Sequence, residues 1–503
     1  MKSSPCFRSV HFLSDYTYFF MQSRLIFKVL GFLIIIFSVS LLPPLLIGWF
    51  DEDGTFQAFL QSWGGLLLLG ALMWFPNRKK SDELKIRDGF LIVVLFWLVL
   101  ALSGALPFIL AVHPQMSIVD AVFESMSGLT TTGATVLTGL DHLPRSILYY
   151  RQQLQWLGGM GIIVLAVAIA PVLGVGGMQL FRAETPGPIK NNKITPRITE
   201  TAKALWLIYF GLTVLAAALY FAAGMSLFDA IGHSFSTLAI GGFSTHDANI
   251  AYFNSPLIDS LVMLFMFIAG INFSLHYLAM HRRSLRYYFF DSEIKAYLLI
   301  LSVLSLITIS LLIYQGVFTE TSSAIRYGLF QVISIATTTG FTTADFSYWP
   351  GLLPVLLIIG SFVGGCAGST AGGMKVIRIE LLLRQGRREI DRLLHPNAVL
   401  PIKLNKRPVP DSVISAVWGF FALYVISFVS LGLLMMMSGS DIVTAFSATA
   451  ATLNNLGPGL GEVADNYRSI SDSGKWILSF SMLLGRLELF SLLVVLTPAF
   501  WKG

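Results

Sequence analysis

The sequence predicts an all-α polytopic membrane protein with about ten transmembrane helices. Three observations lead to this fold class: apolar stretches recur along the chain, basic residues gather in alternate connections, and one short segment is repeated four times. Of the 503 residues, 55% are hydrophobic and 12% are charged, whereas soluble domains average about 25% charged residues. The composition therefore excludes a soluble protein.

Ten stretches are long enough to cross a bilayer, which takes roughly 20 residues in a helix. They fall near residues 26–49, 57–75, 88–112, 149–173, 203–223, 257–280, 294–315, 350–374, 412–437 and 475–499. The stretch that begins near Leu25 lacks a small-residue cleavage site and is expected to be a retained helix rather than a signal peptide. The two cysteines, Cys6 and Cys366, imply no disulfide framework.

The basic residues predict the topology. Four connections, residues 77–87, 181–203, 281–295 and 375–407, hold 23 of the 34 lysines and arginines. By the positive-inside rule these connections are cytoplasmic. Basic residues near both ends of the chain place both termini on the same side, which requires an even number of crossings. Because the charges lie in the loops of a membrane protein, the net charge of +6 does not indicate nucleic-acid binding.

An internal repeat predicts the architecture. Segments 120–133, 229–242, 327–340 and 444–457 each end in a glycine after a short helix-compatible stretch, and the glycines recur after 109, 98 and 117 residues. Each segment is too short to span and is expected to re-enter the membrane, where irregular backbone is tolerated only if protein buries it or water lines it. The sequence thus predicts four pseudo-symmetric helix–pore loop–helix repeats around one pore, preceded by an extra helix pair. The expected segments are an N-terminal segment (1–24), the helix pair (25–80) and repeats at 81–185, 186–285, 286–395 and 396–503.

The repeated loops have the composition of a cation filter. A narrow pore must replace the water around an ion with oxygens, and extended backbone carbonyls can do so. Glycine permits the dihedral angles that such a loop needs. The predicted cation-binding residues are Thr131, Thr132, Gly133, Ile240, Gly241, Gly242, Thr338, Thr339, Gly340, Asn455, Leu456 and Gly457.

The eighth crossing predicts a gate. Five glycines among residues 364–373 make a poor helix, since each costs up to about 1 kcal/mol relative to alanine. We expect an intramembrane loop below the filter; close helix packing through small residues is the alternative. The gate residues predicted there are Gly364, Gly365, Gly368, Ser369, Thr370, Gly372 and Gly373. Arg486, in the last crossing, is expected in the conduction path as a positive barrier or a partner of this loop; the alternative is a structural ion pair with Glu488 or another helix.

Polar residues near the pore helices have plainer interpretations. Glu124 and His233 are expected to form hydrogen bonds behind the filter, although a carboxylate at the mouth could also concentrate cations. His246 is expected at the outer mouth, and residues 155–161 are expected to pack tightly behind the first loop. The basic segment 381–394 could contact anionic lipid or a protein partner.

The filter segments resemble a known family. The motifs Ser127-Gly-Leu-Thr-Thr-Thr-Gly-Ala134, Ala336-Thr-Thr-Thr-Gly-Phe-Thr-Thr343 and Thr452-Leu-Asn-Asn-Leu-Gly-Pro-Gly459 are similar to the filter loops of bacterial Trk/Ktr-type potassium uptake proteins, with the best match to the TrkH/TrkG membrane-subunit branch. The resemblance implies a K⁺-permeable pore in the bacterial inner membrane, with K⁺ at the filter residues and no organic cofactor. It also implies a homodimer that docks on a cytoplasmic, nucleotide-binding regulatory subunit of the TrkA type. The second loop, with Ile240 and Gly241, and the fourth, with Asn455, depart from the threonine-rich form.

Two other functions remain open at this point. A proton- or sodium-coupled potassium transporter would also use broken helices and sites at mid-membrane, but it favours paired intramembrane carboxylates, which the sequence does not present. A membrane enzyme would need a metal-ligand or nucleophile motif, and none is found. Neither alternative predicts four glycines in equivalent positions.

Overall fold

The computed structural model of the chain describes residues 12–78, 86–161, 198–405 and 407–502. Helices make up nearly all of the regular structure in these ranges, which confirms the predicted all-helical membrane fold class. The one β element there is a short antiparallel hairpin of β1 (Lys403–Leu404) and β2 (Arg407–Pro408) in the longest basic connection.

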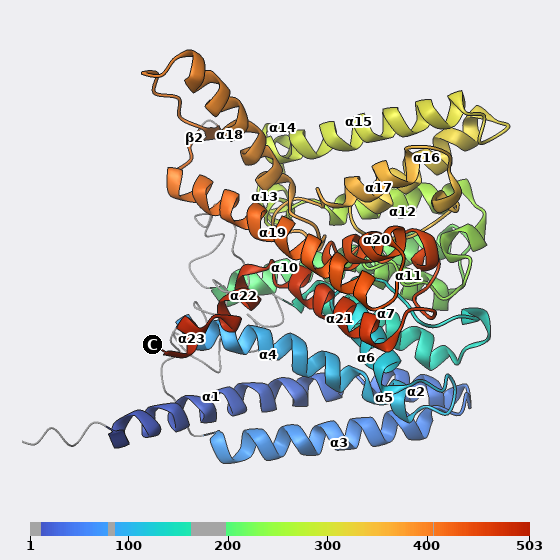
Figure 1. The fold of residues 1–503 in the computed structure, drawn as a ribbon. Helices are drawn as coiled ribbons and strands as arrows, with labels where there is room; N and C mark the ends of the chain where they lie inside the picture. The colour runs from blue at the N-terminus through green and yellow to red at the C-terminus, as the bar shows by residue number, and fades with distance from the viewer. Residues whose placement is uncertain (1–11, 79–85, 162–197, 406, 503) are drawn as a thin grey trace, which may run out of the picture.

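Six helical segments of the described ranges are long and apolar enough to cross a membrane. They are α1 (Phe12–Val39) continued by α2 (Leu42–Phe50), α3 (Phe56–Trp74), α4 (Ile86–Gly104) continued by α5 (Leu106–Leu110), α10 (Ile198–Ala222), α15 (Ser292–Tyr314) and α19 (Asp411–Met437). Helices α1 and α3 form the predicted extra pair and cross where Gly31 and Gly70 meet; a Cβ on Gly31 would lie 2.8 Å from the Gly70 carbonyl oxygen. Figure 1 shows this pair at the edge of the bundle.

Two predicted crossings are sharply bent. Helices α12 (Pro256–Ala269) and α13 (Phe273–His281) meet at 93°, and α21 (Asp472–Arg486) meets α22 (Phe490–Leu496) at 116°. At the first bend Gly270 is followed by Asn272, whose side chain accepts a hydrogen bond from the Ser274 amide and begins a new helix. At the second bend Glu488 and Leu489 both have positive φ, +49° and +59°. If each bent pair counts as one span, the described residues contain up to eight.

Two further predicted crossings are incomplete as helices. The crossing at 149–173 begins as α7 (Arg145–Gly159), and its second half lies outside the described residues. The crossing at 350–374 contains only α17 (Leu353–Ser361); residues 364–375 are not helical, and α18 (Val376–Leu394) follows them. The expected interruption of this crossing is therefore confirmed.

Four short helices precede the repeated glycines. They are α6 (Ile118–Leu129), α11 (Leu227–Ala239), α16 (Thr321–Ala336) and α20 (Ile442–Leu453). With 12 to 16 residues each, they are shorter than the roughly 20 residues that a span requires. The Ser117 and Ser226 side chains cap α6 and α11 by accepting from the amides of Asp120 and Asp229. Each serine hydroxyl also donates to the carboxylate of the same aspartate, so both repeats use their shared aspartate in the cap.

Short elements complete the described part of the chain. They are η1 (Phe75–Asn77), η2 (Leu140–His142), η4 (Asn249–Phe253), α14 (Arg286–Phe290), η5 (Phe346–Tyr348), η6 (Gly461–Val463) and α23 (Pro498–Lys502). In Figure 1 the first turns of α1 and the final helix α23 lie at the same end of the bundle, together with α13, α14 and α18. The described parts of the basic connections thus gather at one end, and the short helices α6, α11, α16 and α20 lie toward the other.

Candidate functional site

The four repeated loops share one backbone conformation. The residue two positions before each glycine has a left-handed φ: +57° at Thr131, +56° at Ile240, +69° at Thr338 and +53° at Asn455. Such angles are uncommon for residues other than glycine and cost of order 1–3 kcal/mol each. The amide that follows bonds the carbonyl five residues earlier in every loop, at 2.7–2.9 Å, which is a helix-ending motif. Sequences as different as Thr-Thr-Thr and Asn-Asn-Leu therefore form the same loop.

Close approaches between the loops form a closed ring. A Cβ on each repeated glycine would collide with the carbonyl oxygen of the residue that precedes the glycine of the next repeat. The pairs are Gly133 with Gly241 (2.1 Å), Gly242 with Thr339 (2.2 Å), Gly340 with Leu456 (2.1 Å) and Gly457 with Thr132 (2.7 Å). The last pair returns to the first repeat, so the four loops surround a single axis in the order of the sequence.

The ring presents oxygens of the kind that can replace the water around an ion. The twelve predicted cation-binding residues lie in these loops, and the side chains of Thr131, Thr338 and Asn455 are at most 1% exposed. No carboxylate belongs to the ring, so backbone carbonyls and threonine hydroxyls are the oxygens it offers. Carbonyl oxygens arranged around one axis can replace the hydration shell of a cation.

Side chains that surround the ring hold the four loops in place. Gln155 of α7 donates to the Gly241 carbonyl at 2.6 Å and accepts from the Phe243 amide at 3.1 Å. Asn455 donates to the Thr132 hydroxyl at 2.9 Å, which joins the fourth loop to the first. Residues 155–161 were predicted to pack tightly, and Gly158 does: a Cβ there would lie 1.9 Å from the Leu129 carbonyl oxygen. The bracing role of Gln155 was not predicted, although an uncharged amide within an expected span is a usable signal.

Glu124 and His233 form hydrogen bonds behind the ring, as predicted, and Gln331, which was not predicted, does the same. Glu124, His233 and Gln331 each precede their repeat glycine by nine residues. Glu124 is fully buried, accepts from Thr135 and the Val136 amide, and pairs with Arg151 at 2.7 Å. His233 bonds the Ser244 hydroxyl at 2.9 Å, and Gln331 donates to the Ala344 carbonyl at 2.7 Å. These bonds tie α6, α11 and α16 to the non-helical segment that follows each loop.

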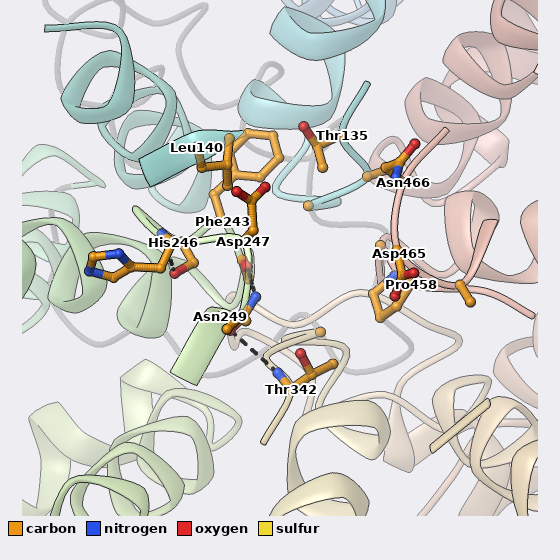
Figure 2. Close-up of a pocket in the computed structure, with 18 of the residues that line it drawn as sticks. Thr135, Leu140, Phe243, His246, Asp247, Asn249, Thr342, Pro458, Asp465 and Asn466 are labelled. Carbon is orange, nitrogen blue, oxygen red and sulfur yellow. Dashed lines mark hydrogen bonds between the residues drawn. The ribbon is translucent and has the colours of Figure 1, made fainter. Parts of the chain in front are cut away.

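An open cavity lies on one side of the ring. Its volume is about 570 Å³, and all four repeated glycines line it. Figure 2 shows residues of every repeat around it, with Thr135 from the first, Asp247 from the second, Thr342 from the third and Asp465 from the fourth. Together with Asp345, these aspartates give the cavity an excess of carboxylates, which attracts cations. Burial and the nearby Asp345 raise the pKa of Asp465.

His246 lies at the edge of this cavity, as predicted. It bonds Asp141 of η2 at 2.5 Å and lies 3.4 Å from Asp229, so it links the outer loops of the first two repeats. Burial lowers the pKa of His246, but the hydrogen bonds to Asp229 and Asp141 outweigh burial and raise it overall. The imidazole of His246 also stacks on the side chain of Tyr252.

The non-helical segment 364–375 crosses the opposite side of the ring. The Thr370 hydroxyl donates to the Leu238 carbonyl at 2.9 Å, the Gly372 amide to the Thr338 hydroxyl at 2.8 Å, and the Gly373 amide to the Asn454 carbonyl at 3.0 Å. These are contacts to the second, third and fourth repeats. Within the segment, Gly364, Gly368 and Gly373 have positive φ, and Gly365 and Ser369 pack at its turn. Of the residues predicted for the gate, Thr370, Gly372 and Gly373 contact the ring, whereas Gly364, Gly365, Gly368 and Ser369 form the rest of the segment.

Arg486 completes this layer by reaching the first repeat. Its guanidinium donates to the Thr131 hydroxyl at 3.2 Å, the Thr370 carbonyl at 3.3 Å and the Gly158 carbonyl at 2.6 Å. Glu488, the alternative partner considered from the sequence, instead pairs with Arg378. Arg486 therefore connects the first filter loop to segment 364–375.

Together, a single ring of four re-entrant loops, an acidic cavity on one side and a glycine-rich segment on the other define a multi-pass membrane protein of the cation-transport class. Comparison with known proteins leads to the same class. The family model described as "TrkH: Cation transport protein" matches residues 55–502. The Trk system potassium uptake protein TrkH of Halomonas elongata is 56% identical over 482 residues, which cover 96% of this chain and all of that protein.

More distant and structural relatives agree. The Trk system potassium uptake protein TrkG of Escherichia coli K12 is 37% identical and covers 95% of this chain and 99% of its own length. The crystal structure of the potassium transporter TrkH from Vibrio parahaemolyticus superposes with a TM-score of 0.88 at 53% identity, covering 96% of this chain and 100% of that chain. The chain therefore belongs to the TrkH family of cation transport proteins. The resemblance found in the filter motifs is confirmed, and the family consists of transporters rather than enzymes.

Proposed function

We propose that this chain is the membrane subunit of a Trk-type potassium uptake system and that K⁺ passes through the ring of four loops. The observation that carries the proposal is the closed cycle of contacts between each repeat glycine and the carbonyl of the next repeat. A quartet of identical backbone turns around one axis offers oxygens at equal depth from four sides. Relatives above 50% identity are named potassium uptake proteins, which identifies K⁺ as the ion.

The filter is assigned to the three residues that end at each repeat glycine, the twelve predicted from the sequence. Their backbone carbonyls would coordinate the dehydrated ion. The short helices α6, α11, α16 and α20 aim their carbonyl ends, which carry partial negative charge, at the ring. The acidic cavity raises the local cation concentration before entry.

The gate is assigned to segment 364–375 and Arg486. The segment bonds directly to the second, third and fourth repeats, and Arg486 bonds both the first repeat and the segment itself. An ion that leaves the filter on this side meets both a backbone barrier and a fixed positive charge. Glycines at Gly364, Gly368 and Gly373 allow the segment to change conformation without steric strain.

The positive-inside rule gives the orientation of the protein in the membrane, and the orientation indicates which end is available to a cytoplasmic partner. The end of the bundle that carries the basic connections would face the cytoplasm of a bacterial inner membrane, with both termini on that side. The amphipathic helix α18 (Val376–Leu394) directly follows the proposed gate at this end and would receive a TrkA-type nucleotide-binding subunit. We further propose that the functional unit is a homodimer.

Flux through purified protein in liposomes tests the proposal. With a K⁺ gradient as the only driving force, this chain should carry K⁺ or Rb⁺ downhill, and uptake should be faster than that of Na⁺. A requirement for an opposing or accompanying H⁺ or Na⁺ gradient would instead establish coupled transport. Absence of K⁺ flux under every gradient, with and without a TrkA-type subunit, would contradict the proposal.

A further inference from the structure

An apolar groove lies away from the pore, at the end of the bundle with the basic connections. Its volume is about 620 Å³, within the range of roughly 300–1,000 Å³ that is usual for small-molecule pockets. Ile208 and Leu212 of α10 form one wall, and Leu298 of α15 forms the other. Phe267 and Ile271, at the bend between α12 and α13, form its floor. Because both walls belong to spanning helices, the groove is accessible at membrane depth.

Basic residues lie at the groove and next to it in the sequence. Lys295 lines the groove, and Arg282, Arg283 and Arg286 lie within three residues of the lining residues Met280 and Tyr288. All four side chains are exposed, and none forms an ion pair with a carboxylate in the part of the chain that the structure describes.

Large apolar side chains accompany these charges. Leu285, Phe289 and Phe290 are 69%, 73% and 75% exposed, and Phe289 also lines the groove. Basic residues interleaved with exposed aromatic side chains are typical of a segment that lies at the surface of an anionic membrane. The rim therefore favours a negatively charged amphiphile.

The floor of the groove is bonded to segment 364–375. The Cys366 amide donates to the Gly270 carbonyl at 2.8 Å, and the Phe273 amide donates to the Gly368 carbonyl at 3.0 Å. On the α15 side, the carboxylate of Glu293, next to the groove residue Ile294, accepts from the Ala367 amide at 2.7 Å. Any occupant that separates or fixes these walls acts on residues 366–368 through three hydrogen bonds.

We propose that this groove binds an anionic phospholipid, with an acyl chain between α10 and α15 and the phosphate held by Lys295 and the neighbouring arginines, and that the bound lipid stabilises one position of segment 364–375. A cationic rim fits a phosphate headgroup better than it fits the identical cationic rim of a second copy of this chain. The coupling to segment 364–375 rests on the proposed function, whereas the binding does not.

Photo-crosslinking tests the headgroup contact. The full-length protein is reconstituted in phosphatidylcholine vesicles that contain a trace of phosphatidylglycerol with a photoactivatable acyl chain, and crosslinked peptides are mapped by mass spectrometry. Crosslinks should fall on α10 and α15, and Lys295→Ala should reduce them about fivefold, the equivalent of about 1 kcal/mol for one basic residue at an anionic surface. Lys403→Ala, an exposed lysine of the β-hairpin, should leave them unchanged. Equal crosslinking by photoactivatable phosphatidylcholine, or no effect of Lys295→Ala, would overturn the proposal.

Filling the groove tests the acyl-chain contact. Leu212→Trp should abolish the α10 and α15 crosslinks. Leu215 lies on the same helix, is 50% exposed and does not line the groove, so Leu215→Trp should preserve them. Loss of dimer with Leu212→Trp and no lipid crosslinks in the wild type would show a second copy in the groove and overturn the lipid assignment.

K⁺ flux tests the coupling between the bound lipid and segment 364–375. The flux of the wild type should change severalfold when phosphatidylglycerol is added, and that of Leu212→Trp should not. Lipid crosslinks with flux that is independent of phosphatidylglycerol would overturn the coupling alone; no K⁺ flux in any lipid would contradict the proposed function instead.

Discussion

Serine in place of Gly340 should disrupt the ring without unfolding the protein. A Cβ there would lie 2.1 Å from the Leu456 carbonyl oxygen and 2.8 Å from Cδ of Pro458. The carbonyl must move by about 1 Å to relieve the overlap. Gly340 also has φ of +80°, which costs a residue with a side chain roughly 1–2 kcal/mol. The steric displacement and the backbone strain need to be separated experimentally.

Gly316→Ser provides the matched control. Gly316 belongs to the same repeat and has φ of +62°, but a Cβ there meets no atom within 4 Å. Both variants should lose similar stability from backbone strain, whereas Gly340→Ser alone moves a carbonyl of the filter. We expect Gly340→Ser to lower the preference for K⁺ over Na⁺ by at least about tenfold, equivalent to about 1.4 kcal/mol, and Gly316→Ser to keep it.

The assay is competition in proteoliposomes. Uptake of a Rb⁺ tracer is measured against increasing external K⁺ or Na⁺, and the ratio of the two inhibition constants gives the preference. Size-exclusion chromatography in detergent verifies that both variants are folded. If folded Gly340→Ser retains the wild-type ratio, the assignment of the four glycine loops as the filter is refuted.

Four further predictions concern the layers around the ring. Arg486→Ala should raise K⁺ flux severalfold because it removes a positive charge and a bond to Thr370, and Arg145→Ala, an exposed arginine far from this layer, should not; lower flux together with lower expression would make Arg486 a structural residue. Deletion of residues 368–373 should also give higher and less regulated flux, and a folded deletion protein that conducts no better would contradict the gate. Gln155→Leu leaves the Gly241 carbonyl and the Phe243 amide without their partner, which costs about 1–3 kcal/mol for each unsatisfied buried group. The preference for K⁺ over Na⁺ should therefore fall in Gln155→Leu, whereas Gln153→Leu, which loses a bond to the Ser40 carbonyl instead, should retain it. Equal preferences in the two variants would argue against bracing by Gln155. Asp229 and Asp141 raise the pKa of His246, so protonated His246 stabilises the folded protein below the ordinary histidine pKa, and this contribution is lost as pH rises past the raised value. The thermal unfolding temperature of the wild type should therefore fall between about pH 5.5 and about pH 8.5, and His246→Gln should remove this dependence.

The four glycine loops could be predicted from the sequence because they recur at regular intervals. Glycines at four equivalent positions, each after a short helix, required no tertiary information. The left-handed φ of Ile240 and Thr338 was not predictable in this way, because β-branched residues disfavour that conformation. The loop contacts of all four repeats impose it.

The two bends differ in how visible they are to sequence analysis. Gly270 followed by Asn272 contains a helix end and a helix start, so the 93° bend could have been predicted. The 116° bend at Glu488 and Leu489 has no glycine or proline. It depends on long-range contacts such as the ion pair between Glu488 and Arg378, which are 110 residues apart.

The partners of buried polar residues were also beyond sequence analysis. Arg486 was expected at depth, but its bonds to Thr131 and Thr370 join segments more than 100 residues away. The pair of Glu124 with Arg151 likewise brings two helices together. Sequence composition shows that a buried charge needs a partner, while only the folded chain determines which one.

Anomalous diffraction from crystals grown in Rb⁺ or Tl⁺ tests the central claim most directly. The account predicts difference peaks on the axis enclosed by Gly133, Gly242, Gly340 and Gly457, level with the carbonyls that precede these glycines. Peaks found only beside the carboxylates of the outer cavity, with none on that axis, would contradict it.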